Sequence, residues 1–290
     1  MQTTITIAGK SKHPLTVNRP GYGTMRLTGD GIYGEPADRP GALQILRRAI
    51  EAGVNFLDTA DYYGEDVTNR LIVEALYPYP PDLVICTKVG VTRDAGKNVI
   101  PFNTPADLRR GIENNLRTLK LDQIQLVHFR VFGNATPFEE SMQAMFDMQR
   151  EGKILHVGAS NVSPEQLRIA ASMGDIATVE NMYGHTTRTT LVVGDHTNQG
   201  GEEVLKICEE KEIPLIPYYS VFQSMPQKDE RLIAIAQKYN ATVAQISIAW
   251  LLHRSQWILP IPGTSSLAHF EENLKAADIV LTAEDMRFLE

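Results

Sequence analysis

The 290-residue chain has few cysteines, no excess of basic charge and no long apolar run. Its two cysteines, Cys86 and Cys208, are too few for a secreted disulfide framework, so we expect buried thiols in a reducing compartment. The 28 basic residues face 35 acidic ones, and the resulting net charge of −7 does not supply the basic surface that nucleic acids require. No stretch approaches the roughly 18 uninterrupted apolar residues of a membrane-spanning helix.

The sequence also begins without the features of a signal peptide, because Met1–Ile5 contains no basic region leading into an apolar stretch. Hydrophobic residues make up 43% of the chain and charged residues 22%, which excludes wholesale disorder. We therefore expect a cytoplasmic protein, either a monomer or a weak homo-oligomer, with no nucleic-acid or membrane partner.

Short apolar runs alternate with amphipathic segments along most of the chain. The predicted strands end at Tyr22–Gly23 and span 55–60, 83–89, 124–131, 154–160, 178–182, 215–220 and 258–261. The predicted helices lie near 41–53, 67–77, 105–120, 137–152, 164–173, 201–212, 230–253 and 267–277. Thr104, Thr136 and Ser163 each precede a proline, which predicts three capped helix starts.

Mostly apolar strands that alternate with helices indicate a parallel sheet covered on both faces. Eight strand–helix units of roughly 30 residues fit this length, so we predict a (β/α)8 TIM barrel in which residues 1–290 form a single domain. Residues 1–18 read as an N-terminal β-hairpin before the barrel. An open doubly wound sheet is the alternative, but it usually needs fewer strands for one domain.

Reactive side chains in such a barrel are expected where strands end and loops begin. An aspartate and a lysine at apolar strand ends would be costly alone, so we expect Asp58 and Lys88 to pair. No metal site is predicted. The strand ends carry, in chain order, Asp58, Thr59, Tyr63, Lys88, His128, Arg130, Ser160, Asn161, Glu180, Tyr219 and Ser220.

At these positions the sequence resembles the aldo-keto reductases. Phe56–Gly64 is similar to the family's Asp-Thr-Ala-x-x-Tyr-Gly motif, and the blocks Thr87–Lys88, Gly158–Asn161 and Ile261–Ser265 follow in the family's order. The resemblance extends from Gly21 to Asn273. Within the family the sequence is similar to bacterial pyridoxal reductases, through segments such as 66–69, 74–79 and 250–255.

Reduction of a carbonyl by hydride places negative charge on its oxygen, so a proton donor must stand there. A tyrosine of ordinary pKa, about 10, is a reluctant donor or base at neutral pH, and a nearby ammonium favours its phenolate form. Tyr63 as acid, Lys88 as the neighbouring cation and Asp58 as its anchor satisfy this chemistry, as the resemblance also implies. The alternatives are a purely structural ion pair and a packing aromatic beside Tyr62.

The fourth strand departs from the family pattern. Most members carry a histidine that orients the carbonyl, whereas this chain has Arg130 there and His128 two residues earlier. We expect both side chains to face inward, with His128 one layer deeper and satisfied by a neighbour. Arg130 is a permanent cation that can hold the substrate oxygen without shuttling a proton.

The resemblance implies a nicotinamide cofactor across the barrel mouth. Ser160 and Asn161 would bind its carboxamide, Glu180 stands where the family commonly has glutamine, and Tyr219 would stack on the ring. Thr264 and Ser265 begin a helix whose free NH groups favour a phosphate, although a plain helix cap is the alternative reading. The full set of cofactor candidates is Gly23, Thr24, Met25, Asp58, Ser160, Asn161, Glu180, Tyr219, Ser220, Gly263, Thr264, Ser265, His269, Glu272 and Asn273.

Family members selective for the 2′-phosphorylated cofactor often carry lysine and arginine in place of Gly263 and His269, yet NADPH remains favoured here over NADH. The loops 32–34, 131–133 and 185–188 would surround a flat polar aldehyde with aromatic and cationic groups. The sequence therefore predicts NADPH-dependent reduction of a small-molecule aldehyde, with pyridoxal to pyridoxine as the candidate reaction. The alternatives are a non-catalytic NADPH-binding regulatory module and a Schiff-base lyase that uses Lys88.

Overall fold

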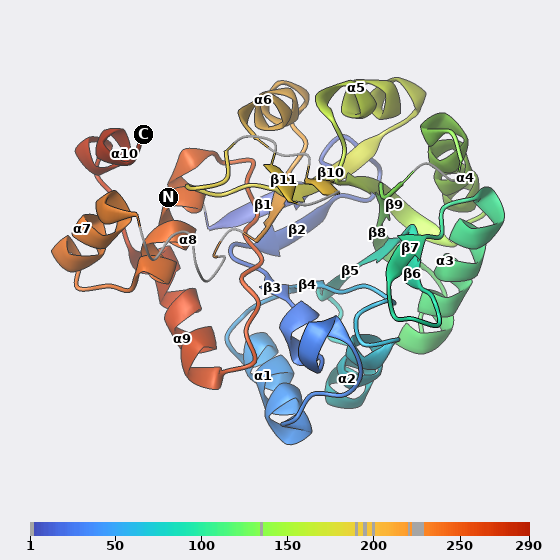
Figure 1. Cartoon of the computed structure of the whole chain (residues 1–290), viewed down its shortest axis with the longest axis horizontal. Coiled ribbons are helices and arrows are strands. Elements are labelled where there is room, and N and C mark those ends of the chain that lie inside the picture. The colour runs from blue at the N-terminus through green and yellow to red at the C-terminus, as the bar shows by residue number, and fades with distance from the viewer. Residues whose placement is uncertain are drawn as a thin grey trace.

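The computed structural model describes residues 3–133, 136–188, 191–193, 196–198, 201–219, 221 and 229–290. Its centre is a curled sheet of seven strands, all paired in parallel, with helices forming an outer ring (Figure 1). The strands are, in sheet order, β3 (Tyr22–Gly23), β4 (Phe56–Asp58), β5 (Val84–Val89), β8 (Ile124–Arg130), β9 (Ile154–Ser160), β10 (Ile176–Met182) and β13 (Leu215–Tyr218).

The predicted eighth strand closes the barrel without forming a regular ladder. Ile258 makes a single parallel bridge to Leu215 in β13, and the backbone NH of Gly21 donates to the carbonyl of Pro260 at 2.9 Å. Prolines at 260 and 262 lack an NH group, which prevents continuous pairing through this segment. The segment therefore lies between the first and last strands of the sheet, and the predicted (β/α)8 fold is confirmed.

The helices agree with the predicted alternation. They are α1 (Arg39–Glu51), α2 (Val67–Leu76), α3 (Pro105–Leu119), α4 (Phe138–Arg150), α5 (Pro164–Met173), α6 (Glu202–Lys211), α7 (Glu230–Lys238), α8 (Val243–Arg254), α9 (Leu267–Lys275) and α10 (Ala283–Leu289). Thr104 and Ser163 form the predicted capping boxes. The prediction for Thr136 is wrong, because α4 begins after Pro137 with no capping side chain. None of the described helices combines the length and apolarity needed to cross a bilayer.

The single helix predicted over 230–253 is also wrong, since the structure divides it into α7 and α8. Asn240 adopts a left-handed backbone conformation with a φ of 49°, which ends the first helix. Thr242 then starts the second helix with a capping box to Gln245. Residues 239–242 contain neither glycine nor proline, so the sequence has no strong helix-breaking signal at this point.

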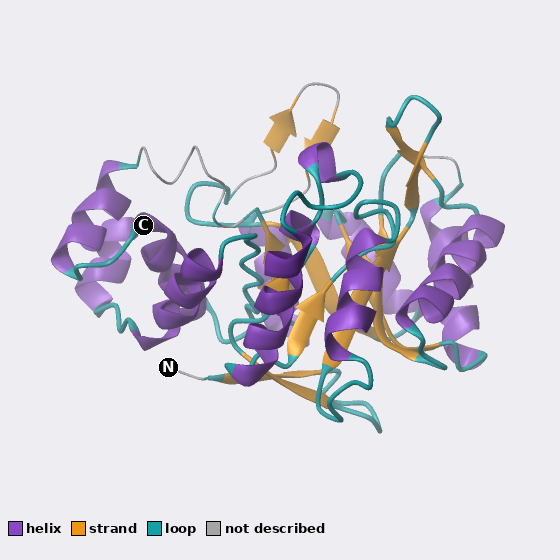
Figure 2. Ribbon diagram, turned by 90° about the horizontal axis from the view of Figure 1, so that it is seen from below, coloured by secondary structure: helices purple, strands orange, loops and turns teal. Residues whose placement is uncertain are grey.

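Short hairpins cover both ends of the barrel (Figure 2). The predicted N-terminal hairpin is confirmed as β1 (Thr4–Ile7) and β2 (Leu15–Asn18), whose buried side chains pack against the start of the central strands. The opposite end of the barrel carries two hairpins that were not predicted. Helix α10 was not predicted either. The two hairpins are β6 (Val91–Arg93) with β7 (Val99–Pro101), and β11 (Leu191–Val193) with β12 (His196–Asn198).

A buried arginine fastens the closing segment to the first strand. The Arg19 side chain donates to the carbonyl of Ile258 at 2.7 Å and to that of Ser255 at 2.8 Å. It also reaches the carbonyl of Leu252 at 3.4 Å, at the end of α8. These carbonyls have no regular ladder to satisfy them, so Arg19 supplies donors where the barrel closes.

Arg19→Met keeps most of the apolar stem but removes the donors from this closure. We expect the free energy of unfolding to fall by about 2–4 kcal/mol, because buried carbonyls lose charge-assisted partners. Urea denaturation measures this loss. The exposed Arg47 on α1 provides the control, since Arg47→Met should change stability by less than about 0.5 kcal/mol. Equal losses in the two variants would contradict the assigned role of Arg19.

Candidate active site

A buried ion pair joins two neighbouring strands at the centre of the barrel. The Lys88 ammonium lies 2.5 and 2.6 Å from the two carboxylate oxygens of Asp58, and it also donates to the carbonyl of Thr59 at 3.2 Å. Asp58 pairs in register with Cys86, so Lys88 follows two residues further along β5 on the same face. The side chains are 3% and 4% exposed. The predicted pairing of Asp58 with Lys88 is confirmed.

Glu180 brings a second carboxylate to the same ammonium from β10, across the barrel. Its Oε1 lies 3.3 Å from Nζ of Lys88, and its Oε2 lies 3.0 Å from Nδ1 of His128. Glu180 was predicted to contact the cofactor, whereas in this structure its two oxygens lie against Lys88 and His128. Two buried carboxylates therefore share one cation.

His128 occupies the deeper inward position predicted for it. Its Nε2 lies 2.7 Å from Oγ1 of Thr178, and its Nδ1 lies 3.3 Å from the sulfur of Cys86. Gly158 leaves the space for this ring, because a Cβ at that position would come within 2.3 Å of the imidazole. Burial lowers the pKa of His128, so the ring is neutral at physiological pH.

Burial and the Lys88 charge shift the pKa values of the acidic groups beside Lys88 in opposite directions. Burial raises the pKa of Asp58, the neighbouring Glu180 raises it further, and Lys88 opposes both effects. Burial also raises the pKa of the Cys86 thiol well above its usual value. Donor atoms of Asp58, Cys86 and His128 lie within 4.8 Å of one another, a spacing that a metal ion could bridge. In this structure the cation beside Asp58 is the Lys88 ammonium, and the thiol that would have to ionise is neutral.

Tyr63 packs over the ion pair in the segment after β4. Nζ of Lys88 lies 5.2 Å from the centre of its ring, and the ring of Tyr62 lies 4.9 Å away on another side. Burial raises the pKa of Tyr63 well above 10, and the favourable effect of Lys88 on the phenolate is smaller. The expected lowering of the Tyr63 pKa is therefore outweighed in this structure. The neutral phenol is in the correct state to donate a proton.

Arg130 ends β8 one layer above His128. Lys88 and His128 are register partners, so Arg130 lies two residues beyond them toward the barrel mouth. Its Nη1 donates to the hydroxyl of Tyr62 at 2.7 Å, and its guanidinium lies 5.1 Å from the centre of the same ring. The two inward positions predicted for β8 are confirmed.

The residues predicted to hold the carboxamide and the nicotinamide ring follow β9 and β13. Ser160 is buried at the end of β9, and Asn161 accepts a hydrogen bond from the Tyr218 hydroxyl and donates to the carbonyl of Val131. Asn161 and Tyr219 both adopt left-handed backbone conformations, with φ of 57° and 53°. Tyr219 is half-buried beside Tyr218. Ser220 lies outside the described residues.

The other cofactor candidates lie around the first strand and the start of α9. Thr24 donates to the carbonyl of Asp58 at 2.9 Å through both its NH and its hydroxyl, which ties the end of β3 to the ion pair. Met25 is half-buried against the cluster that contains Tyr62 and Tyr63. Gly23 is buried. Thus the structure brings these three residues beside the central network.

The start of α9 is partly exposed to solvent. Ser266 caps this helix by accepting from the NH of His269, which supports the plain-cap reading for that residue. Gly263, Ser265 and His269 are exposed, while Thr264, Glu272 and Asn273 are half-buried. A Cβ on Gly263 would lie 2.5 Å from the carbonyl oxygen of Gly23, so a lysine cannot replace this glycine without movement of the backbone.

Arg93 was not among the predicted site residues. The β6–β7 hairpin brings it to the barrel mouth. Arg93 donates to the carbonyls of Gly31 and Ile32 at 3.1 and 3.0 Å, and its guanidinium lies 5.7 Å from the ring centres of Tyr33 and Tyr62. A signal was available, since residues 94–98 contain turn formers and are flanked by β-branched residues on both sides.

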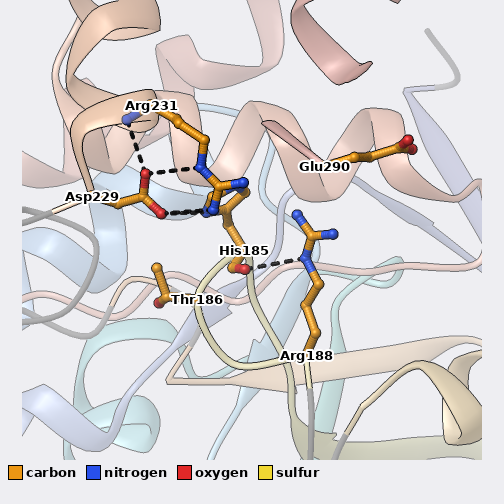
Figure 3. Close-up of a pocket in the computed structure, with 6 residues that line it drawn as sticks. All are labelled: His185, Thr186, Arg188, Asp229, Arg231 and Glu290. Carbon is orange, nitrogen blue, oxygen red and sulfur yellow. Dashed lines mark hydrogen bonds and ion pairs between the residues drawn. The ribbon is translucent and has the colours of Figure 1, made fainter. Parts of the chain in front are cut away.

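A separate pocket of about 420 Å³ lies beside α7 and the C-terminal residue (Figure 3). Three of its lining residues belong to the loop 185–188 that was predicted to surround the substrate, and none belongs to the predicted catalytic or cofactor set. Its cations already have partners, because Arg231 pairs with Asp229, and Arg188 donates to the carbonyls of His185 and Leu289. The pocket is lined by His185, Thr186, Arg188, Asp229, Arg231 and Glu290.

The chain is similar to known proteins in sequence and in fold. The model of the Aldo/keto reductase family matches residues 21–290. Pyridoxine 4-dehydrogenase of Escherichia coli is 38% identical over 293 residues, which covers 99% of this chain and 97% of the relative. The crystal structure of a thermostable aldo-keto reductase in complex with the inhibitor epalrestat has a TM-score of 0.80 at 26% identity, covering 99% and 98% of the two chains. An aldo/keto reductase from Klebsiella pneumoniae, solved with NADP and acetate, has a TM-score of 0.77 at 24% identity, covering 100% and 94%.

Because two carboxyls share the Lys88 ammonium, removing it should lower stability in a pH-dependent way. Lys88→Met leaves two buried carboxyls without their cation, so we expect unfolding free energy to fall by about 3–5 kcal/mol near neutral pH. Both carboxyls would then have folded-state pKa values above their unfolded values of about 4. The folded state would bind more protons, so stability would decline as the pH rises through the folded-state pKa values. Urea denaturation at several pH values measures this slope.

The control combines Lys88→Met with Glu180→Gln. Only one buried carboxyl then remains without a partner, so part of the stability should return and the pH slope should become shallower. A loss that does not depend on pH in the single variant would contradict the shared-cation arrangement.

Proposed function

The chain belongs to the aldo/keto reductase family, and from this premise we propose that it is an NADPH-dependent reductase of aldehydes that acts on pyridoxal. One observation carries the proposal: Asp58, Lys88 and Tyr63 are buried together at the ends of adjacent strands. The substrate is supported by the 38% identity to the E. coli protein named Pyridoxine 4-dehydrogenase. Dehydrogenation of pyridoxine, which that name denotes, is the reverse of the reduction proposed here.

Residues at the barrel mouth fit a nicotinamide dinucleotide. The exposed hydroxyl of Ser265 and the imidazole of His269 stand at the N-terminal end of α9, where a phosphate is favoured by the helix dipole. Ser160, Asn161 and Tyr219 stand at the strand ends nearer the ion pair. The Klebsiella pneumoniae protein of the same fold was solved with NADP. When bound, the reduced nicotinamide supplies the hydride.

Tyr63 donates the proton in this mechanism. As hydride reaches the carbonyl carbon, the electron pair of the C=O bond moves to oxygen, and the neutral phenol of Tyr63 protonates it. The phenolate left behind is stabilised by the Lys88 ammonium. Asp58 keeps that ammonium charged and fixed in place. Arg130 adds a permanent positive charge near the developing oxyanion.

The Schiff-base alternative requires a neutral, accessible amine. Lys88 is 3% exposed, and the carboxylates of Asp58 and Glu180 raise its pKa well above 10.5 despite its burial. Both facts disfavour nucleophilic attack by this lysine. The non-catalytic NADPH-binding module differs from the proposed enzyme in one measurable respect, because it would bind NADPH without oxidising it in the presence of any aldehyde.

Tyr63→Phe removes only the phenolic hydroxyl. We expect turnover of pyridoxal to fall by roughly 10²–10⁴-fold, because proton donation is lost, while the Kd for NADPH stays within about twofold. NADPH absorbance measures the rate and NADPH fluorescence measures binding. Tyr77→Phe on an exposed ring is the control and should leave both values unchanged. Near-normal turnover in Tyr63→Phe would remove this residue from the role.

His269→Arg tests the proposed position of the 2′-phosphate. An added guanidinium at the exposed start of α9 should lower the KM for NADPH by roughly tenfold, the scale of one charge-assisted hydrogen bond, and leave that for NADH unchanged. Steady-state kinetics with both cofactors measures the ratio. His13→Arg, on a distant exposed loop, controls for added charge. An equal effect on both cofactors would place the phosphate elsewhere.

A further inference from the structure

Arg130 is a partly buried cation without an anionic partner. Its recorded polar contact is the hydrogen bond from Nη1 to the Tyr62 hydroxyl, and no ion pair to Arg130 occurs among the residues that the structure describes. Two other half-buried arginines have carboxylate partners. Arg254 pairs with Glu202, and Arg48 pairs with Glu271. A guanidinium removed from water needs acceptors for its donors, and among the described residues the acceptor of Arg130 is the Tyr62 hydroxyl at Nη1.

The groups that face Arg130 from the surrounding elements are phenolic side chains. Tyr62 and Tyr63 approach it from the segment after β4, and Tyr218 approaches it from β13. Burial acts to lower the Arg130 pKa, but these phenols raise it more, so the guanidinium keeps its charge. The nearby Arg93 is different, because backbone carbonyls of Gly31 and Ile32 accept from it.

Arg130 lies beside the position where the substrate carbonyl must lie. The rings of Tyr62 and Tyr63 are 4.9 Å apart, so an oxygen that receives the Tyr63 proton is a neighbour of the group that Arg130 binds. One donor of the guanidinium is engaged by Tyr62. Its remaining donors form a planar fork that suits two oxygens held side by side on one ligand.

We propose, resting on the proposed function above, that Arg130 selects aldehydes that carry an anionic oxygen next to the carbonyl. Such an oxygen supplies the missing counter-charge, while the carbonyl oxygen stays within reach of Tyr63. A 3-hydroxypyridine-4-carbaldehyde belongs to this class, since its ring hydroxyl is adjacent to the aldehyde and ionises readily. The anionic oxygen is unchanged by the reaction, which consumes one hydride and one proton at the carbonyl. The aromatic wall of Tyr62, Tyr63 and Phe132 suits the flat ring.

The test compares 3-hydroxypyridine-4-carbaldehyde with its 3-methoxy analogue, which cannot ionise. The parent protein should prefer the hydroxy aldehyde at least tenfold in kcat/KM. Arg130→Gln should slow both aldehydes, because Arg130 also lies near the developing oxyanion, but the hydroxy aldehyde should lose at least tenfold more in kcat/KM, which removes the preference. Arg130→Lys, which keeps the charge without the fork, should retain part of the preference. Arg93→Gln is the matched control and should leave the ratio of the two substrates unchanged.

Equal losses for both aldehydes in Arg130→Gln would overturn the proposal, because Arg130 would then act on the carbonyl oxygen alone. Binding of the product, 3-hydroxypyridine-4-methanol, provides a readout that needs no turnover. The parent with NADP should bind it at least tenfold more tightly than Arg130→Gln does, and equal Kd values would also overturn the proposal. A parent that shows this binding difference but reduces neither aldehyde would refute the proposed reductase while supporting Arg130 as the anion-binding residue.

Discussion

The contact between the Lys88 ammonium and the Asp58 carboxylate is the constraint on which the rest of the site depends. It joins the ends of β4 and β5 at the centre of the barrel, where neither charge could remain alone. Tyr63 packs on one side of this pair, and Glu180 and His128 lie on the other. The parallel barrel makes the arrangement possible because it brings the carboxyl ends of all its strands to one mouth.

Burial and the Lys88 charge shift the pKa of Tyr63 in opposite directions, and their balance decides whether the phenol keeps its proton. Lys88 favours the phenolate of Tyr63, yet burial keeps the phenol neutral in the structure described. A neutral phenol beside a fixed cation is suited to give up a proton when negative charge develops next to it. Glu180 adds a second negative charge close to the cation, which distinguishes this network from one built on a neutral glutamine. Arg130 places a further positive charge one layer above, toward the barrel mouth.

The sequence allowed much of the site to be predicted, and the reasons can be stated residue by residue. Asp58 and Lys88 end apolar strands, so their pairing follows from the cost of burying charge. His128 and Arg130 share a face because side chains alternate along a strand. Arg93 was missed because no strand was predicted between residues 89 and 105, where the β6–β7 hairpin lies. The break between α7 and α8 was missed because residues 239–242 contain neither glycine nor proline.

The order of strands and helices, the residues at the strand ends and the family resemblance were all determined by the sequence alone, since they depend on local pattern and motif spacing. The tertiary structure decided what each polar group touches. Glu180 reaches Lys88 only because the closed barrel brings β10 opposite β5, and Arg130 reaches Tyr62 only through the loop that follows β4. The protonation state of Tyr63 likewise depends on burial by residues distant in the chain. Such through-space distances and desolvation have no signature in a linear sequence.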